Sequence, residues 1–546
     1  MTAGESARKK EEAQMIFRSP HPDVEIPDVP LPGFVLSRAR ELGDKPALID
    51  GPSGRMLTYE RLAGSVKRAA AGLAERGFSK GDVFAIHSPN VPEYAIALLA
   101  VASLGGVVTT LNPLYTAHEM AGQLRDSGAS YLLTVPPLLG KARAAADTVG
   151  VREVFVFGEA KGATPFAALL ADDGHPPAIT IDPGEDVTAL PYSSGTTGRP
   201  KGAMLTHRNL VASLCQSDGL GLTREDDTVP AVAPFSHISG LVLSMLMSLY
   251  KGATIVTMPR FDLEGFLQLV QDHRVTLGYL VPPIVLALAK HPIVDRYDLS
   301  SLRCIVTGAA PLGAEVEREC AERLGVPVLK QFGMTETSGL VSTTPADDPA
   351  KAKPGSVGPL VRTTEGRIVD PATGEDVAAG EEGELRVRGP QVMKGYLNRP
   401  EATSSAIDAD GWLRTGDIGR ADEDGYLYVV DRLKELIKYK GWQVAPAELE
   451  AVLLSHPKVA DAAVIGSPDE EAGELPKAFV VPEREPTAEE ILSFVAARVA
   501  PYKKIRKVEF VEEIAKSPSG KILRRVLIER ERQAVGKSGR KDPRPV

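Results

Sequence analysis

A short loop between two apolar runs carries side chains well suited to bind an anion. Residues 191–205 read PYSSGTTGRPKGAML, with four Ser or Thr side chains, three glycines and one lysine. Glycines let backbone N–H groups approach a ligand closely, hydroxyls add donors, and a lysine adds positive charge. Together these residue types indicate a polyphosphate-binding loop, and its candidate members are Ser193, Ser194, Gly195, Thr196, Thr197 and Lys201.

The loop is not a Walker A motif. Neither Gly195 nor Gly198 is followed by Gly-Lys-Ser/Thr at the required offset, and Pro200 stands immediately before Lys201. Proline also disfavours a helical backbone at Arg199. We therefore expect a flexible phosphate clamp rather than a cradle at a helix N-terminus.

Three later stretches carry side chains that suit the rest of a nucleotide. QFGMTETSG contains Thr335 and Glu336, and Mg²⁺ typically takes only one or two protein carboxylates beside phosphates. GWLRTGDIGRADEDGYLYVVDRLKE contains Asp417 and Arg432, which can hydrogen-bond to ribose hydroxyls. KSPSGKILRR carries Lys521 on a Ser-Pro-Ser-Gly turn, where a lysine without accompanying motifs is more often exposed than catalytic.

As a set, these motifs resemble the acyl-adenylate-forming superfamily of acyl-CoA synthetases, luciferases and peptide-synthetase adenylation domains. The set consists of the loop, GMTE, TGD, DRLKELIKYKG and SPSGK, in that order. LVPPIVLALAKHP, TGAAPLGAE and KYKGWQVAPAELE are most similar to the 4-coumarate–CoA ligase branch. The resemblance extends from about residue 20 to residue 530, and its motifs are long and specific.

The resemblance implies two half-reactions. A carboxylate attacks the α-phosphate of ATP to give an acyl-AMP and pyrophosphate, and the thiol of coenzyme A then expels AMP. Lys521 would bridge the carboxylate and the α-phosphate, Thr335 would contact the α-phosphate and Glu336 would hold Mg²⁺. His237, in APFSHISG, resembles the gate beside the acyl carbon. The other nucleotide contacts that the resemblance implies are Ala309, Ala310, Gln331, Phe332, Asp417, Arg432, Lys438 and Gln443.

The same resemblance implies that a small C-terminal domain rotates between the half-reactions. Lys434 takes the hinge position. Gly441 would line the pantetheine tunnel, where a side chain would obstruct the thiol, and Lys440 and Arg260 would meet the phosphates of coenzyme A. The implied cofactors are ATP, Mg²⁺ and coenzyme A.

The expected acyl pocket departs from the pattern of plant coumarate ligases. Ser239 stands where a tyrosine is expected, Gln331 replaces the glycine before Phe332, and Ser338-Gly339-Leu340 replaces GPV. A buried glutamine needs a hydrogen-bond partner, which is either a ligand hydroxyl or the pocket wall. The expected pocket residues are Ser239, Leu243, Tyr279, Gly308, Gly339 and Leu340.

These observations predict an ATP-dependent acid–CoA ligase that acts on 4-coumarate-like aryl or hydroxycinnamic acids. A medium-chain fatty acyl-CoA synthetase is the main alternative. An adenylating enzyme with another acceptor and a nucleotide sensor without activity are further alternatives. KYKGWQVAP with Gly441 favours the CoA ligase, and the presence of Lys521, Glu336 and His237 argues against a sensor.

Strands and helices alternate along most of the chain. Residues 82–88 and 302–310 predict strands, whereas residues 261–274 and 313–325 predict amphipathic helices. The resulting prediction is an α/β fold: a large N-terminal domain of two parallel α/β subdomains plus a small distorted β-barrel, and a small mobile α+β C-terminal domain. An apolar turn is expected after the loop, followed by a helix capped by Thr206.

The chain of 546 residues is too long for one core, and we expect domains at residues 1–431 and 432–546. The net charge of -9 argues against a nucleic-acid partner. The three cysteines are far apart, and the N-terminus lacks a signal-peptide pattern, so a reducing, cytoplasmic setting is expected.

The apolar run at residues 94–118 predicts a buried helix and strand rather than a membrane span. A small carboxylic acid is the expected partner, and the protein is expected to be a monomer or homodimer.

Overall fold

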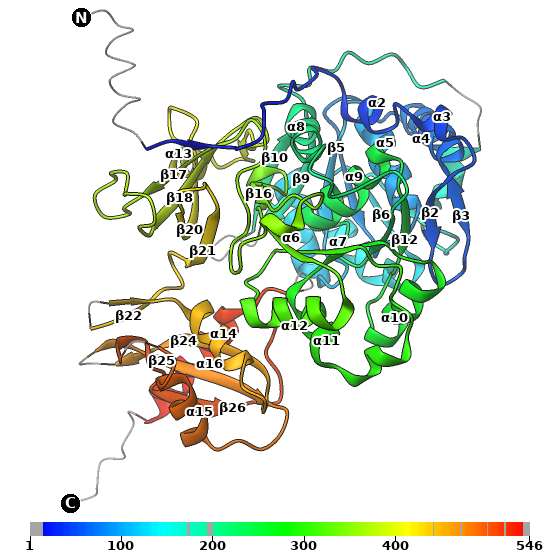
Figure 1. Ribbon diagram of the computed structural model, residues 1–546. Coiled ribbons are helices and arrows are strands. Elements are labelled where there is room, and N and C mark those ends of the chain that lie inside the picture. The colour runs from blue at the N-terminus through cyan, green and yellow to red at the C-terminus, as the bar shows by residue number, and fades with distance from the viewer. Residues whose placement is uncertain are drawn as a thin grey trace, which may run out of the picture.

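A large lobe and a smaller lobe make up the protein (Figure 1). The computed structural model describes residues 15–171, 175–193, 200–440, 442–469, 472–499, 501–517 and 520–538. The large lobe contains parallel α/β sheets and a five-stranded antiparallel sheet, and the small lobe is α+β. The predicted fold class is confirmed.

An eight-stranded sheet carries the strands on either side of the phosphate loop. Its order is β19-β10-β9-β5-β4-β6-β7-β8, with parallel pairing from β9 to β8. The strands are β4 (Val83–His87), β5 (Val107–Leu111), β6 (Tyr131–Thr134), β7 (Glu153–Val156), β8 (Thr164–Pro165), β9 (Val187–Ser193), β10 (Lys201–Thr206) and β19 (Gly395–Tyr396). Its helices include α4 (Tyr59–Glu75), α5 (Glu93–Ser103), α6 (Ala117–Ser127) and α7 (Leu139–Val149).

Two local predictions can be compared with this sheet. The long apolar run forms the buried helix α5 and then the buried strand β5, as expected. The segment after the phosphate loop was expected to be a turn, and this was wrong: it forms strand β10, because it pairs with both β9 and β19. Thr206 caps the next helix, α8 (His207–Ser217), through a reciprocal capping box with Asn209.

Two four-stranded sheets form the second α/β layer. Their orders are β11-β12-β2-β3 and β13-β14-β15-β16, and they adjoin where the Thr276 amide donates to the Thr228 carbonyl at 3.0 Å. Their strands are β2 (Pro46–Asp50), β3 (Met56–Thr58), β11 (Thr228–Ala231), β12 (Thr254–Thr257), β13 (Leu277–Leu280), β14 (Cys304–Thr307), β15 (Val328–Phe332) and β16 (Ser342–Thr343). Neighbouring helices are α10 (Leu263–Asp272), α11 (Pro282–Lys290) and α12 (Ala314–Leu324).

Strands β13 to β15 have two different faces, because side chains alternate along a strand. Leu280 and Ile305 pack into the core formed with α10 and α11. Tyr279 and Val306 join a separate apolar cluster with Leu243. Leu243 lies on a π-helix, Ser239–Leu246, that leads into α9 (Met247–Lys251). The remaining helices of the large lobe are α2 (Leu31–Val35), α3 (Ala39–Leu42) and α13 (Pro400–Ala406).

The five-stranded sheet is antiparallel and lies beside the two α/β layers (Figure 1). Its order is β1-β17-β18-β20-β21, so the N-terminal strand pairs with strands from the later part of the chain. The strands are β1 (Phe17–Arg18), β17 (Glu365–Val369), β18 (Gly383–Arg388), β20 (Leu413–Ala421) and β21 (Leu427–Arg432). This sheet corresponds to the small distorted β-barrel that was predicted for the large N-terminal domain.

The small lobe begins after β21. Its sheet has the order β23-β22-β25-β24, with β26 parallel to β25. The elements are β22 (Ile437–Tyr439), β23 (Trp442–Val444), α14 (Pro446–Leu454), β24 (Val459–Asp469), β25 (Gly473–Pro482), α15 (Ala488–Ala496), β26 (Lys507–Phe510) and α16 (Arg524–Ser538). The domain boundary at residue 431/432 stays a prediction. Among the described residues, no helix is both long and apolar enough to cross a membrane.

Candidate active site

The turn that carries Lys521 packs against the large lobe. The Ser517 amide donates to the Lys521 carbonyl at 2.8 Å, and the Lys521 amide donates to the Ser517 hydroxyl at 3.1 Å. Gly520 has a φ of +77°, and a Cβ there would lie 2.9 Å from Pro283 Cδ of α11. Glycine at this position therefore permits both the turn and its close approach to the large lobe.

Asp417 and Arg432 face each other across β20 and β21 beside Lys521. The Arg432 Nε lies 2.7 Å from Asp417 Oδ1, whereas the buried Oδ2 has no hydrogen-bond partner in the described part of the chain. Burial raises the pKa of Asp417 to about 6, although the charges of Arg432 and Lys521 oppose this shift. Burial and the Arg432 guanidinium lower the pKa of Lys521. The unpartnered oxygen is an acceptor that a ligand hydroxyl can use.

His237 also lies within the electrostatic reach of Lys521. Its Nδ1 lies 2.9 Å from the Ser239 hydroxyl. Burial and, as the smaller cause, the Lys521 charge lower the pKa of His237 to about 4, so the imidazole is neutral near pH 7. Asn90 fixes the segment before it by donating to the carbonyls of Ala231 and Ala233 at 2.7 and 2.9 Å.

Glu336 lies in a tight turn between β15 and β16. The turn Thr335–Thr337 follows Gly333, where a Cβ would lie 2.1 Å from the Gly339 carbonyl oxygen. Glu336 is 5% exposed, and its Oε1 accepts a hydrogen bond from the Tyr396 hydroxyl at 2.7 Å. The aromatic ring of Tyr396 also contacts Lys201, whose Nζ lies 4.9 Å from the ring centroid. Residues from β10, from β19 and from the turn after β15 thus lie together.

Several predicted pocket residues share one apolar environment. Leu243, Tyr279 and Leu340 belong to the same buried cluster, and the Tyr279 hydroxyl lies 2.8 Å from Thr223 Oγ1. Gln331 covers Gly308, since a Cβ on Gly308 would lie 2.9 Å from Gln331 Cγ. The Gln331 Oε1 atom is buried, and no described residue is its hydrogen-bond partner.

The glycine and alanine positions of this region have unusual backbones. Gly339 has a φ of +95°, and its α-carbon faces the π-helix at Ile238 and Val242. Ala309 has a φ of +69° directly after β14 and is exposed, with Ala310 next to it. Phe332 ends β15, and its carbonyl accepts a hydrogen bond from the Val341 amide at 2.8 Å.

The other predicted residues lie in several different elements. Lys438 and Gln443 are exposed and oppose each other in the β22–β23 pair, while Arg260 is exposed shortly after β12. Lys440 is exposed with a φ of +47°, and Lys434 is exposed between β21 and β22. Ser193 ends β9 opposite Lys201. Ser194, Gly195, Thr196, Thr197 and Gly441 lie outside the described residues.

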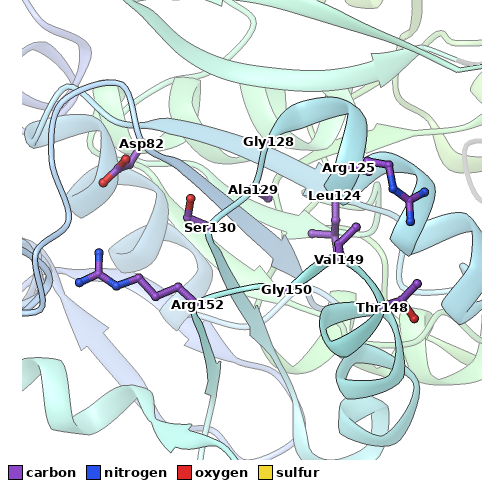
Figure 2. Close-up of a pocket in the computed structure, with 10 residues that line it drawn as sticks. All are labelled: Asp82, Leu124, Arg125, Gly128, Ala129, Ser130, Thr148, Val149, Gly150 and Arg152. Atoms are coloured by element: carbon purple, nitrogen blue, oxygen red, sulfur yellow. The ribbon is translucent and has the colours of Figure 1, made fainter.

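A hollow of about 430 Å³ lies elsewhere, between the C-terminal ends of α6 and α7 (Figure 2). Asp82, Ser130 and Arg152 come just before β4, β6 and β7, so this is the amino edge of the parallel strands. Ligands of open α/β sheets bind at the carboxyl edge. Arg125 and Arg152 also point away from each other, and no predicted site residue lines the hollow.

Two parts of the site were missed by the sequence analysis. Tyr396 gave no local signal, because its contacts depend on the pairing of β19 with β10. Arg524, three residues after Lys521, binds Glu450 at 2.6 Å and Glu435 at 2.8 Å. These ion pairs could not be predicted from the sequence, because Glu435 and Glu450 are far from Arg524 along the chain.

The fold and these clusters are typical of a two-lobed nucleotide-binding enzyme, with Lys521 of the small lobe close to Asp417 and Arg432. The chain belongs to the AMP-binding enzyme family. The family's AMP-binding enzyme profile matches residues 36–397, and the profile of its C-terminal domain matches residues 448–521.

Curated relatives match nearly the whole chain. A protein named 4-coumarate–CoA ligase 5 from Oryza sativa subsp. japonica is 47% identical over 94% of this chain and 97% of its own length. A protein named 4-coumarate–CoA ligase 1 from Solanum tuberosum is 44% identical over 96% of this chain and 98% of its own length. The resemblance inferred from the motifs is thereby confirmed.

Solved structures support the fold assignment. ATP-bound MatB from Rhodopseudomonas palustris has a TM-score of 0.83 and 30% identity, covering 92% of this chain and 99% of that chain. The anthranilate CoA ligase AuaEII in complex with anthranoyl-AMP has a TM-score of 0.86 and 27% identity, covering 94% of this chain and 99% of that chain.

Proposed function

We propose that the chain is an ATP-dependent acid–CoA ligase that acts on hydroxycinnamic acids such as 4-coumarate. The observation that carries this conclusion is the identity of 43–47% to 4-coumarate–CoA ligases along 94–96% of the chain. The Lys521–Asp417–Arg432 cluster supplies the charge that such a reaction needs.

The first half-reaction must bring two anions together. A carboxylate oxygen of the acid attacks the α-phosphorus of ATP, and the bond to the leaving pyrophosphate breaks. The product is a mixed anhydride, acyl-AMP. We assign Lys521 to the space between the two anions, since a fixed positive charge in a water-poor site lowers the cost of their approach. Its proximity to Asp417, Arg432 and His237 supports this role.

The other nucleotide contacts follow the chemistry of their side chains. The unpartnered Asp417 Oδ2 suits a ribose hydroxyl, and Arg432 holds the Asp417 carboxylate in place. The segment with the exposed Ala309 and the partly buried Ala310 suits the flat face of adenine, and Phe332 ends the neighbouring strand β15. We assign the phosphates to Thr335, to Lys201 and to the loop that begins at Ser193.

Glu336 fits a bound Mg²⁺. It is a buried carboxylate without a cationic partner among the described residues, and one oxygen is already oriented by Tyr396. No cluster of three or more metal-ligating side chains occurs in the described ranges, which suits a metal held mainly by phosphates and water. When bound, Mg²⁺ would neutralise phosphate charge.

In the second half-reaction, the thiolate of coenzyme A attacks the acyl carbon, and the carbon–oxygen bond to AMP breaks. We propose that the small lobe turns about Lys434 for this step, bringing Lys440 and Gly441 to the tunnel. Lys438 and Gln443 would then contact AMP, and Arg260 would meet the phosphates of coenzyme A. The exposure of Arg260, Lys438, Lys440 and Gln443 in the present arrangement supports a role that requires the other orientation.

The acid would lie between the π-helix and strands β13 to β15. His237 and Ser239 lie at one end of the π-helix, and Leu243 and Tyr279 form part of the wall. Gly308, Gly339 and Leu340 would complete the pocket, with Gln331 packed against Gly308. The buried Gln331 Oε1 favours an acid that presents a hydroxyl donor.

A substrate panel tests the acid. We expect kcat/KM to be highest for 4-coumarate, lower for cinnamate, and lowest for octanoate. A preference for octanoate over 4-coumarate by more than about tenfold in kcat/KM, or about 1.4 kcal/mol of transition-state binding, would show that the substrate is a medium-chain fatty acid and not an aryl acid.

A second assay tests the acceptor. AMP release from ATP and 4-coumarate is expected to be slow without coenzyme A and to increase strongly when it is added. AMP release that is equally fast without coenzyme A would indicate another acceptor.

A further inference from the structure

Tyr396 separates the two charged groups at the phosphate end of the site. Its hydroxyl donates to Glu336 Oε1 at 2.7 Å, while the Lys201 ammonium lies 4.9 Å from the centroid of its ring. The phenol thus contacts an anion with its positive end and a cation with its electron-rich face. Burial and the Glu336 carboxylate raise the pKa of Tyr396, so the hydroxyl remains a donor.

The backbone holds this tyrosine firmly. Strand β19 pairs with β10, and the Leu397 amide donates to the Gly202 carbonyl at 2.9 Å. On the other side, the Met393 amide donates to the Glu336 carbonyl at 2.9 Å. The Tyr396 amide itself donates to Thr403 Oγ1 at 2.9 Å. The segment around Tyr396 therefore joins the strand after the phosphate loop to the turn that carries Glu336.

Among the residues that the structure describes, neither charged group has a partner of opposite charge. No described Lys, Arg or His lies within ion-pair distance of Glu336, and no described Asp or Glu lies within that distance of Lys201. A buried carboxylate without a counterion is costly. Without an intervening ring, Lys201 is the cation that would pair with Glu336, and such a pair would neutralise both groups before a ligand arrives.

We infer that Tyr396 is a positioning residue that orients Glu336 for a divalent cation and keeps Lys201 free for a phosphate. This inference rests on the proposed adenylating function and extends it to a residue outside the predicted site. It assigns separate tasks to two parts of one side chain: the hydroxyl orients Glu336, and the ring spaces and holds Lys201.

Two substitutions separate these tasks. Tyr396→Phe removes the hydroxyl and keeps the ring, whereas Tyr396→Leu removes both. Tyr428→Phe is a matched control, because the Tyr428 hydroxyl also donates to a carboxylate, Asp422 at 3.2 Å, and its ring also lies beside a cation, Arg420 at 4.1 Å. Thermal denaturation of each variant reports folding independently.

The first measurement is binding of Mn²⁺ in the presence of a non-hydrolysable ATP analogue, followed by water-proton relaxation without turnover. We expect Tyr396→Phe to raise the Kd for Mn²⁺ about tenfold, which corresponds to about 1.4 kcal/mol. Tyr428→Phe is expected to leave the Kd unchanged. Tyr396→Leu is expected, in addition, to weaken binding of the analogue measured without metal, since Lys201 loses its fixed position.

The second measurement is acid-dependent ATP–pyrophosphate exchange as a function of Mg²⁺. For Tyr396→Phe we expect a higher Mg²⁺ requirement and a nearly normal rate at saturating Mg²⁺. Mn²⁺ affinity equal to that of the parent protein, or a loss no greater than that of Tyr428→Phe, would overturn the inference. A lower melting temperature with an unchanged metal requirement would also overturn it, by showing a purely structural role. If the parent protein itself catalyses no exchange, the proposed function fails instead.

Discussion

At the scale of single residues, the site combines charges that are only partly compensated. Asp417 is 4% exposed and uses one carboxylate oxygen for Arg432, while the other has no partner among the described residues. A buried acceptor of this kind is costly in the free protein and becomes favourable when a ligand donates to it. Such a site prefers a ligand with hydroxyl groups over one that lacks them.

If Asp417 binds the ribose as proposed, the affinity for ATP should depend on pH. Because burial raises its pKa to about 6, the carboxylate becomes protonated as the pH falls below 6 and loses acceptor capacity. We expect the KM for ATP to rise between pH 7 and pH 5 in the parent protein. In Asp417→Asn the KM is expected to be higher at pH 7 and nearly independent of pH.

The raised pKa of Asp417 should also make the free energy of unfolding depend on pH, with lower stability at higher pH. A carboxyl group whose pKa is raised by folding stabilises the protein fully below its unfolded pKa of about 4, and this contribution is lost as the pH rises through about 6. Urea unfolding should therefore show Asp417→Asn gaining stability relative to the parent between pH 4 and pH 8, by as much as about 3 kcal/mol.

A KM for ATP that rises equally in the parent and in Asp417→Asn as the pH falls would assign the pH effect to another group. His237 is not that group, because its pKa of about 4 keeps it neutral over this range.

At the scale of elements, the segment from β11 to the π-helix positions His237. Asn90 donates to the carbonyls of Ala231 and Ala233, and its Oδ1 accepts a hydrogen bond from the Phe235 amide at 2.7 Å. Gly240 closes the segment, since a Cβ there would lie 2.1 Å from the Pro234 carbonyl oxygen. The gate position is thus fixed by backbone contacts rather than by its own side chain alone.

Replacing Asn90 should loosen this segment. Asn90→Leu keeps the branched shape of the side chain but removes the partner of three buried backbone groups, and we expect a loss of about 3 kcal/mol or more in urea unfolding, with a lower kcat. Gln268→Leu, on the exposed face of α10, provides a control expected to stay within about 0.5 kcal/mol of the parent. An unfolding midpoint for Asn90→Leu equal to that of the control would contradict this account.

Most elements could be predicted from the sequence because their signals are local. The β-branched run at β14, the amphipathic pattern of α10 and the cap at Thr206 each depend on neighbouring residues. Strand β10 could not be predicted in this way. Its structure depends on pairing with β9 and with β19, and β19 lies almost two hundred residues away in sequence.

The site could be predicted only where a motif carried it. Asp417, Arg432, Glu336 and Lys521 were identified through motifs, and the ion pair of Asp417 with Arg432 and its electrostatic interaction with Lys521 agree with a shared site. Tyr396 was missed because a tyrosine in a short strand has no distinctive neighbours. Its contacts become apparent only when β10, β19 and the turn after β15 are considered together.

At the scale of the whole molecule, the structure shows one orientation of the small lobe. Lys290 of α11 donates to the Leu454 carbonyl of α14 at 2.9 Å, and a Cβ on Gly313 would lie 3.3 Å from Ala451 Cβ. With Gly520 against Pro283, these contacts join α11 and α12 to the small lobe (Figure 1). They hold Lys521 close to Asp417 and His237.

Crowding this contact should impair adenylation selectively. Gly520→Ala adds a Cβ that would lie 2.9 Å from Pro283 Cδ, and we expect acyl-AMP formation to slow about tenfold or more, because a small misplacement of a reacting group is costly. Gly374→Ala is the control, because Gly374 has a similar φ of +78° and open space around it. Rapid-quench measurement of acyl-AMP distinguishes the two variants, and equal rates would show that the contact does not matter.

The most direct test of the account measures both half-reactions in Lys521→Ala. One assay follows acid-dependent ATP–pyrophosphate exchange, and the other follows thioester formation from supplied 4-coumaroyl-AMP and coenzyme A. If Lys521 serves the first step from the orientation seen here, exchange should fall by about a thousandfold, and thioester formation should stay within about threefold of the parent rate. Equal losses in the two assays would contradict the assignment of Lys521 to one half-reaction, and unchanged exchange would contradict its catalytic role.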